Sequence, residues 1–108
     1  MKKCKINEDC IAFENESEFI SAFSMLNDGK APDDNTIVEG NSSLKFSKIK
    51  EFVSIFGLEN IYFSDRFKHG FIDEIYFDVK NIKETPNRIW FDADEIFFEN
   101  GFLRIWFD

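Results

Sequence analysis

The chain has 108 residues, with 21 acidic against 13 basic side chains and a formal net charge of −8. This balance argues against free nucleic acid or an anionic membrane surface as the ligand, because both repel a negative protein. The length is that of one domain, residues 1–108, whose core can be large enough to need no metal or disulfide.

The first nine residues are polar and rich in lysine, and we expect a lead-in segment or an edge strand there. A positive start with no apolar run behind it does not make a signal peptide. No stretch approaches the ~20 apolar residues of a membrane helix. We therefore expect a cytoplasmic protein, in which Cys4 and Cys10 are reduced thiols rather than a functional disulfide or redox pair.

A strand over residues 10–14 is followed by the first predicted helix. Asn15 and, three residues later, Glu18 form the pattern of a capping box, which marks a helix start. Gly29 supplies the left-handed conformation that ends such a helix. The apolar stripe of this helix, at helical spacing, consists of Phe19, Ala22, Phe23 and Leu26.

Residues 28–35 form an acidic loop that lacks the glycine and glutamate positions of an EF-hand, so we expect a solvated loop. Residues 36–39 and 43–46 flank a Gly-Asn-Ser turn and can form a small hairpin. The second helix is most naturally capped by Ser47, although it can begin as early as Ser43. It ends at Gly57, and its apolar stripe consists of Ile49, Phe52, Val53 and Phe56.

One four-residue pattern is repeated in the second half of the chain: Ile, an aromatic residue, Phe and usually an acid. Side chains alternate along a strand, so Ile and Phe share one face while the middle aromatic and the acid share the other. Five strands of this kind give a sheet with an apolar core face and an aromatic, acidic outer face. The five copies occupy residues 61–64, 75–78, 89–92, 96–99 and 105–108.

Turn chemistry predicts the same register independently. Asn100-Gly101 is a strong signal for a two-residue hairpin, and Lys68-His69-Gly70 fits a three-residue hairpin loop. A two-residue loop at Ala93-Asp94 would complete the set. The predicted partners across these turns are Phe97 with Arg104, Tyr62 with Tyr76, and Trp90 with Phe97.

These elements predict an α+β fold, a two-layer sandwich. Two amphipathic helices pack on a mostly antiparallel, five- to six-stranded meander sheet, and the helical stripes cover its Ile/Phe face.

Catalytic patterns are absent from the sequence. His69 falls in a hairpin turn, where a nucleophile–histidine pair lacks rigid support, and no glycine-rich phosphate loop occurs. Asp65 and Asp73 face each other in the predicted register. Their neighbours Arg66 and Lys68 are cationic, which favours an ordinary rim charge cluster over the alternatives, a shared proton, a bound cation or a minor hydrolase site. We expect no enzyme activity, no metal and no cofactor.

The outer face has several possible roles. Its aromatics can simply pack across strands, residues 1–9 or 28–45 can fold over it, or it can bury itself in a homodimer. A binding role is favoured because Asp92 and Glu95 lie opposite each other, which is unfavourable in the free sheet. Tyr and Trp anchor interfaces, and surrounding acids steer a basic partner. The predicted partner-binding residues are Glu74, Tyr76, Asp78, Trp90, Asp92, Glu95, Phe97, Trp106 and Asp108.

In size, acidity and the aromatic, acidic strands 89–92 and 105–108, the chain resembles the immunity proteins of bacterial toxin systems, both colicin-type and contact-dependent growth inhibition. This resemblance implies a protein that neutralises a basic cognate toxin, a nuclease above all, by covering its active site or substrate surface. The alternatives are a phage-encoded anti-CRISPR or DNA-mimic inhibitor of a nucleic-acid enzyme, and a homodimeric structural module. We expect a monomer when free, with a homodimer as the alternative.

Overall fold

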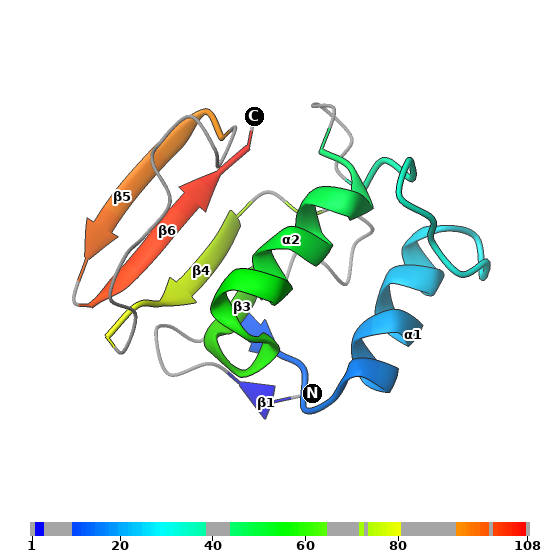
Figure 1. Cartoon of the computed structure of the whole chain (residues 1–108), viewed down its shortest axis with the longest axis horizontal. Helices are drawn as coiled ribbons and strands as arrows, with labels where there is room; N and C mark the ends of the chain where they lie inside the picture. Colours follow the sequence, from blue (N-terminus) through cyan, green and yellow to red (C-terminus); the bar gives the residue numbers. More distant parts are fainter. Residues whose placement is uncertain are drawn as a thin grey trace.

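The computed structural model describes residues 2–3, 10–38, 44–64, 72, 74–80, 93–99 and 101–107. Within these ranges two α-helices pack against one antiparallel sheet, which confirms the predicted α+β class (Figure 1). The elements are β1 (Lys2–Lys3), β2 (Cys10–Ala12), α1 (Glu16–Leu26), α2 (Phe46–Phe56), a 3-10 helix η1 (Leu58–Asn60), β3 (Ile61–Ser64), β4 (Glu74–Asp78), β5 (Glu95–Glu99) and β6 (Phe102–Trp106).

The described strands form a six-stranded sheet in the order β1-β2-β3-β4-β6-β5. Every pairing is antiparallel. A simple meander would set each strand beside its sequence neighbours, whereas β6 pairs with both β4 and β5. The sheet therefore departs from meander order at β6, where Ile105 lies between Ile75 and Ile96.

Two of the predicted registers are confirmed. Phe97 pairs with Arg104 through the hairpin at Gly101, whose φ is 82°, and Tyr62 pairs with Tyr76. The predicted pairing of Trp90 with Phe97 falls outside the described residues. Alternation of faces and turn chemistry thus predicted the register of β3 on β4 and of β5 on β6.

The first helix begins and ends as predicted. The Asn15 side chain accepts a hydrogen bond from the Glu18 backbone N–H at 2.9 Å, which satisfies one of the free donors of the first turn. At the other end Gly29 has φ 81° and its N–H donates to the Ser24 carbonyl at 2.8 Å. The side chain of Leu26, the last member of the predicted stripe, lies outside the part of the chain that the structure describes.

The predicted start of the second helix is wrong. Helix α2 begins at Phe46, one residue before Ser47. The Phe46 N–H donates to the Thr36 carbonyl at 2.8 Å and the Ser47 N–H to the Asp34 carbonyl at 3.2 Å. Backbone acceptors from the preceding segment therefore satisfy donors that a serine side chain would otherwise cap.

Residues 39–43 of the predicted hairpin before α2 lie outside the described residues, and the part on either side of them is joined by a bridge between Ile37 and Lys45. The Val38 N–H donates to the Leu44 carbonyl at 2.9 Å beside it. The predicted end of α2 is confirmed, because Gly57 has φ 85°.

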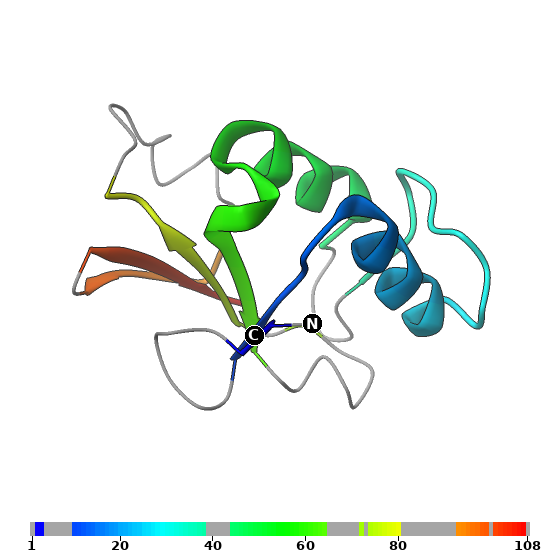
Figure 2. The same cartoon turned by 90° about the horizontal axis from the view of Figure 1, so that it is seen from below.

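Both helices lie on one side of the sheet (Figure 2). The core lies between them and the Ile/Phe face of the sheet. The Phe77 ring lies 4.3 Å from that of Phe56 and 5.2 Å from that of Phe52, between ring centroids. Helix α1 reaches the same face through Phe23, whose ring centroid is 5.9 Å from that of Phe63. Each such buried ring contributes about 1.5–3 kcal/mol of transfer free energy. Neither helix in the described ranges is long and apolar enough to cross a membrane.

The expectation of a reduced Cys10 is contradicted by the structure. Cys10 is only 1% exposed and is disulfide-bonded. The other cysteine of the chain, Cys4, lies outside the described residues. The spacing of two cysteines in the sequence does not show whether their sulfur atoms come within bonding distance in the folded chain.

Candidate protein-binding surface

Strands β4, β6 and β5 present one face away from the helices, here called the outer face. The register arranges its residues in three rows that cross the strands. The rows are Glu74–Trp106–Glu95, Tyr76–Arg104–Phe97 and Asp78–Phe102–Glu99. Two rows therefore read acid–aromatic–acid, and the row between them reads aromatic–cation–aromatic. Among the side chains that the structure describes in these rows, three are carboxylates and one is a guanidinium.

The middle of the outer face is held together by a hydrogen-bonded network. The Tyr76 hydroxyl donates to Glu74 Oε2 at 2.7 Å, and Arg104 Nη2 donates to Glu74 Oε1 at 3.1 Å. The guanidinium carbon of Arg104 also lies 5.1 Å from the centroid of the Phe97 ring, its cross-strand partner, in a cation–π contact. Tyr76 is only 8% exposed. Together with Glu74 it holds Arg104, and through Arg104 the Phe97 ring, in position.

The row that contains Phe102 is also packed from the side. The Tyr62 ring meets the Phe102 ring edge-on, with centroids 6.2 Å apart, and Lys80 Nζ lies 4.7 Å from the Phe102 centroid. Burial raises the pKa of the Tyr62 phenol above its ordinary value of 10.0, and the negative charge of Asp78 raises it further. Tyr62 therefore acts as a neutral packing residue.

The exposed part of the outer face lies at β5 and its neighbour β6. Phe97 is 45% exposed, and Glu95 is exposed beside the half-buried Trp106. Glu95 forms no ion pair with another residue in the described ranges. Within the described part of the chain this combination of an open aromatic, a partly open Trp and a free acid is what a partner would meet first.

The predicted binding residues that the structure describes therefore divide into three groups. Glu74 and Tyr76 belong to the internal network, while Glu95, Phe97 and Trp106 form the exposed part. Asp78 is half-buried, and its Oδ1 accepts from the Lys80 backbone N–H at 3.1 Å. The remaining predicted residues, which lie outside the described ranges, are Trp90, Asp92 and Asp108.

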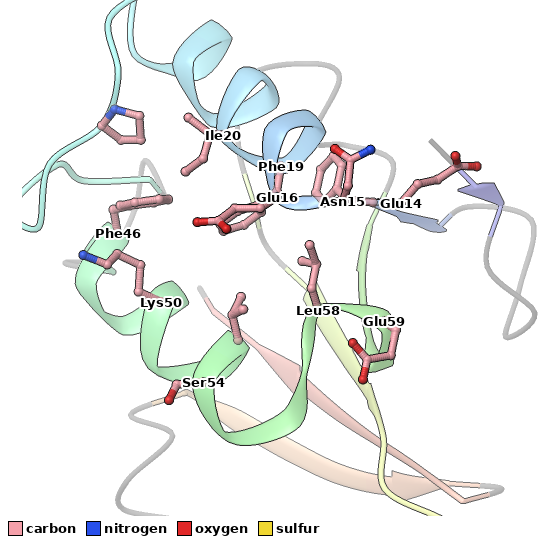
Figure 3. Close-up of a pocket in the computed structure, with 13 residues that line it drawn as sticks. Glu14, Asn15, Glu16, Phe19, Ile20, Phe46, Lys50, Ser54, Leu58 and Glu59 are labelled. Carbon is pink, nitrogen blue, oxygen red and sulfur yellow. The ribbon is translucent and has the colours of Figure 1, made fainter.

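A second surface, which sequence reasoning missed, is a groove between α1 and α2 of about 720 Å³ (Figure 3). Its signal in the sequence was weak: Ile20 and Val53 stand at the margins of the two apolar stripes, and Leu58 follows the helix-ending Gly57. All three apolar side chains are only half-buried. The groove is lined by Phe13, Glu14, Asn15, Glu16, Phe19, Ile20, Pro32, Phe46, Lys50, Val53, Ser54, Leu58 and Glu59.

No three His, Cys, Asp or Glu side chains come together as possible metal ligands among the residues that the structure describes. A scan against protein-family models, a search of curated proteins and a search of solved structures found no match to this chain.

Proposed function

We propose that this protein binds and inhibits a basic protein, in the manner of a toxin-immunity protein, through the exposed part of its outer face. The observation that carries the proposal is the open Phe97 beside the acid–aromatic–acid row of Glu74, Trp106 and Glu95. Buried aromatics supply most of the energy of an interface, and acids at its rim select and steer a cationic partner.

The internal network would prepare this surface for binding. Arg104 holds the Phe97 ring by a cation–π contact and is itself held by Glu74. A ring that is already positioned loses less conformational freedom on association, which raises affinity without any new contact. The proposal therefore gives Glu74 and Tyr76 a positioning role and gives Phe97, Trp106 and Glu95 the direct contacts.

Inhibition would follow from occlusion. The carboxylates of the outer face would occupy the positions at which a basic nuclease binds the phosphates of its substrate, and the aromatics would exclude water around them. A phage-encoded inhibitor of a nucleic-acid enzyme would use the same surface against a different target, so the partner's identity separates these two forms of the proposal.

The proposal also places the protein in the cytoplasm, where disulfide bonds are rare. The disulfide bond of Cys10 makes this point testable. Rapid acid quenching of cells, alkylation under denaturing conditions and mass spectrometry would report the redox state of the buried Cys10. Modified Cys10 would fit a cytoplasmic protein, whereas a persistent disulfide would place the protein in an oxidising compartment.

A homodimer is the second candidate, because β5 exposes an aromatic on each face. Phe98 is 70% exposed on the side of the sheet that carries the helices, directly after Phe97. Light scattering on a size-exclusion column distinguishes the two candidates. A monomer that forms a salt-sensitive 1:1 complex with the product of the adjacent upstream gene supports the inhibitor, and a stable dimer without such a complex supports self-association.

The pair Phe97 and Phe98 gives a matched test of the surface. The two residues are of one type and adjacent on one strand, and they lie on opposite faces. We expect Phe97→Ala to weaken partner binding by about 10- to 100-fold, as for an interface anchor, and Phe98→Ala to leave it unchanged. Equal effects of the two substitutions, measured by calorimetry, would mean that the outer face is not the contact.

A further inference from the structure

The groove between α1 and α2 has an apolar floor and two helical walls. The rings of Phe19 on α1 and Phe46 on α2 stack at its floor, with centroids 5.8 Å apart, and both are buried. Above them stand the half-buried side chains of Ile20, Val53 and Leu58. Figure 3 shows Ile20 and Leu58 in the space between the two helices. A volume of about 720 Å³ is within the usual range of binding clefts.

The rim of the groove is acidic. Glu14, Glu16 and Glu59 line it, and all three are exposed. Among the lining residues that the structure describes, Lys50 is the one cation, and its Nζ lies 2.8 Å from Oδ1 of Asp34, which does not line the groove. Because this lysine is already neutralised, the groove presents negative charge around an apolar floor.

We propose that the groove binds a basic amphipathic helix of a protein partner. In this recognition mode apolar side chains at i, i+3, i+4 and i+7 enter a hydrophobic groove. Ile20, Val53 and Leu58 would receive those side chains, and lysine or arginine on the flanks of the helix would meet Glu16 and Glu59. The exposed carboxylates at the rim attract a basic helix and repel an acidic one, and they give a neutral helix no such attraction.

This site is independent of the outer face. The groove lies in the helix layer, whereas Phe97 and Trp106 lie on the opposite side of the sheet. One partner can therefore occupy either surface without the other, and each proposal can fail alone.

The test uses two synthetic 18-residue peptides with leucine at the same helical positions and either lysine or glutamate elsewhere. NMR of methyl-labelled protein reports on Ile20, Val53 and Leu58. We expect the lysine peptide to shift these methyl signals saturably and the glutamate peptide to leave them unchanged. A lysine peptide that leaves these three residues unshifted, including one that shifts only residues of the outer face, overturns the proposal.

Matched variants test the apolar and the charged parts. We expect Val53→Trp, which fills the groove, to weaken the lysine peptide by more than tenfold. The pair Glu16→Gln and Glu59→Gln should weaken it about five- to tenfold, since each exposed ion pair contributes modestly. Glu51→Gln on α2, outside the groove and paired with Lys48 at 3.4 Å, is the control. Because the rim pair removes two charges and Glu51→Gln removes one, each rim substitution is also measured alone. An effect of Glu51→Gln equal to that of a single rim substitution would reduce the binding to the overall charge of −8 and refute the groove.

Discussion

Substitution of Glu74 should destabilise the fold far more than substitution of Glu95, although both acids flank Trp106 in one row of the outer face. Glu74 accepts hydrogen bonds from the Tyr76 hydroxyl at 2.7 Å and from Arg104 at 3.1 Å. Its side chain is 25% exposed and that of Arg104 29%. Glu95 is exposed, and no ion pair joins it to a described residue.

The magnitude follows from these contacts. A hydrogen bond to a charged group contributes about 1.5–3 kcal/mol when buried, and partial exposure of the ion pair lowers its share. We expect Glu74→Ala to cost about 2 kcal/mol, because it also leaves the nearly buried Tyr76 hydroxyl without this acceptor. Glu95→Ala should stay within about 0.5 kcal/mol, as for an ordinary surface substitution.

Urea denaturation followed by tryptophan fluorescence measures both changes, with constant m as the check for two-state unfolding. A double-mutant cycle with Tyr76→Phe isolates the Glu74–Tyr76 bond, whose coupling should reach about 1 kcal/mol. A coupling near zero, or equal losses for Glu74→Ala and Glu95→Ala, would refute the idea that an internal network holds the outer face.

Three further predictions concern stability. Asn15→Ala should cost about 0.5–2 kcal/mol because it removes the α1 cap, whereas Ser47→Ala should be nearly neutral; chemical denaturation that reversed this order would contradict the helix starts. Gly57→Ala, at φ 85° and ψ 137°, should cost about 1–3 kcal/mol, and more than Gly29→Ala, where a Cβ meets nothing within 4 Å; equal melting temperatures would contradict this. The raised pKa of Tyr62 means that the unfolded chain loses this proton first, so stability present below pH 10 falls as pH rises above it; Tyr62→Phe should reduce that slope in pH-dependent denaturation, and an unchanged slope would refute the assignment.

The sequence determined those parts of the fold that local signals specify. Asn15 and Gly29 set the ends of α1, and the hairpin glycine Gly101 set the register of β5 on β6. Each signal acts within a few residues, through a backbone donor or a positive φ, so no knowledge of distant contacts was needed.

The order of the strands could not be predicted in the same way. All repeats of the Ile–aromatic–Phe pattern have the same core face. Ile75 pairs with Ile105 in the sheet, but by sequence pattern it could pair equally well with the isoleucine of another repeat. The prediction of the α2 start was wrong for a related reason. The carbonyls of Thr36 and Asp34 accept the hydrogen bonds that a serine cap would accept, and they come from a separate segment of the chain. Information of this kind exists only once the chain is folded.

The candidate surface was predictable in its composition but not in its division of labour. Alternation placed Tyr76, Phe97 and Trp106 on one face, yet only the structure separates the nearly buried Tyr76 from the open Phe97. Burial depends on position in the sheet: β4 is flanked by β3 and β6, while β5 ends the described sheet. Strands with the same sequence pattern therefore play different parts. Inside the sheet, β4 holds the outer face in place, whereas β5 at the end of the described sheet leaves its aromatic side chain exposed.

This division also decides which acids a partner can use. The carboxylate of Glu74 is already shared between Tyr76 and Arg104, so a basic partner would have to break these bonds to reach it. Glu95 carries no such cost, because it is exposed and has no ion-pair partner in the described ranges. The salt dependence of partner binding should accordingly fall with Glu95→Gln, whereas Glu74→Gln should act chiefly through the position of Phe97.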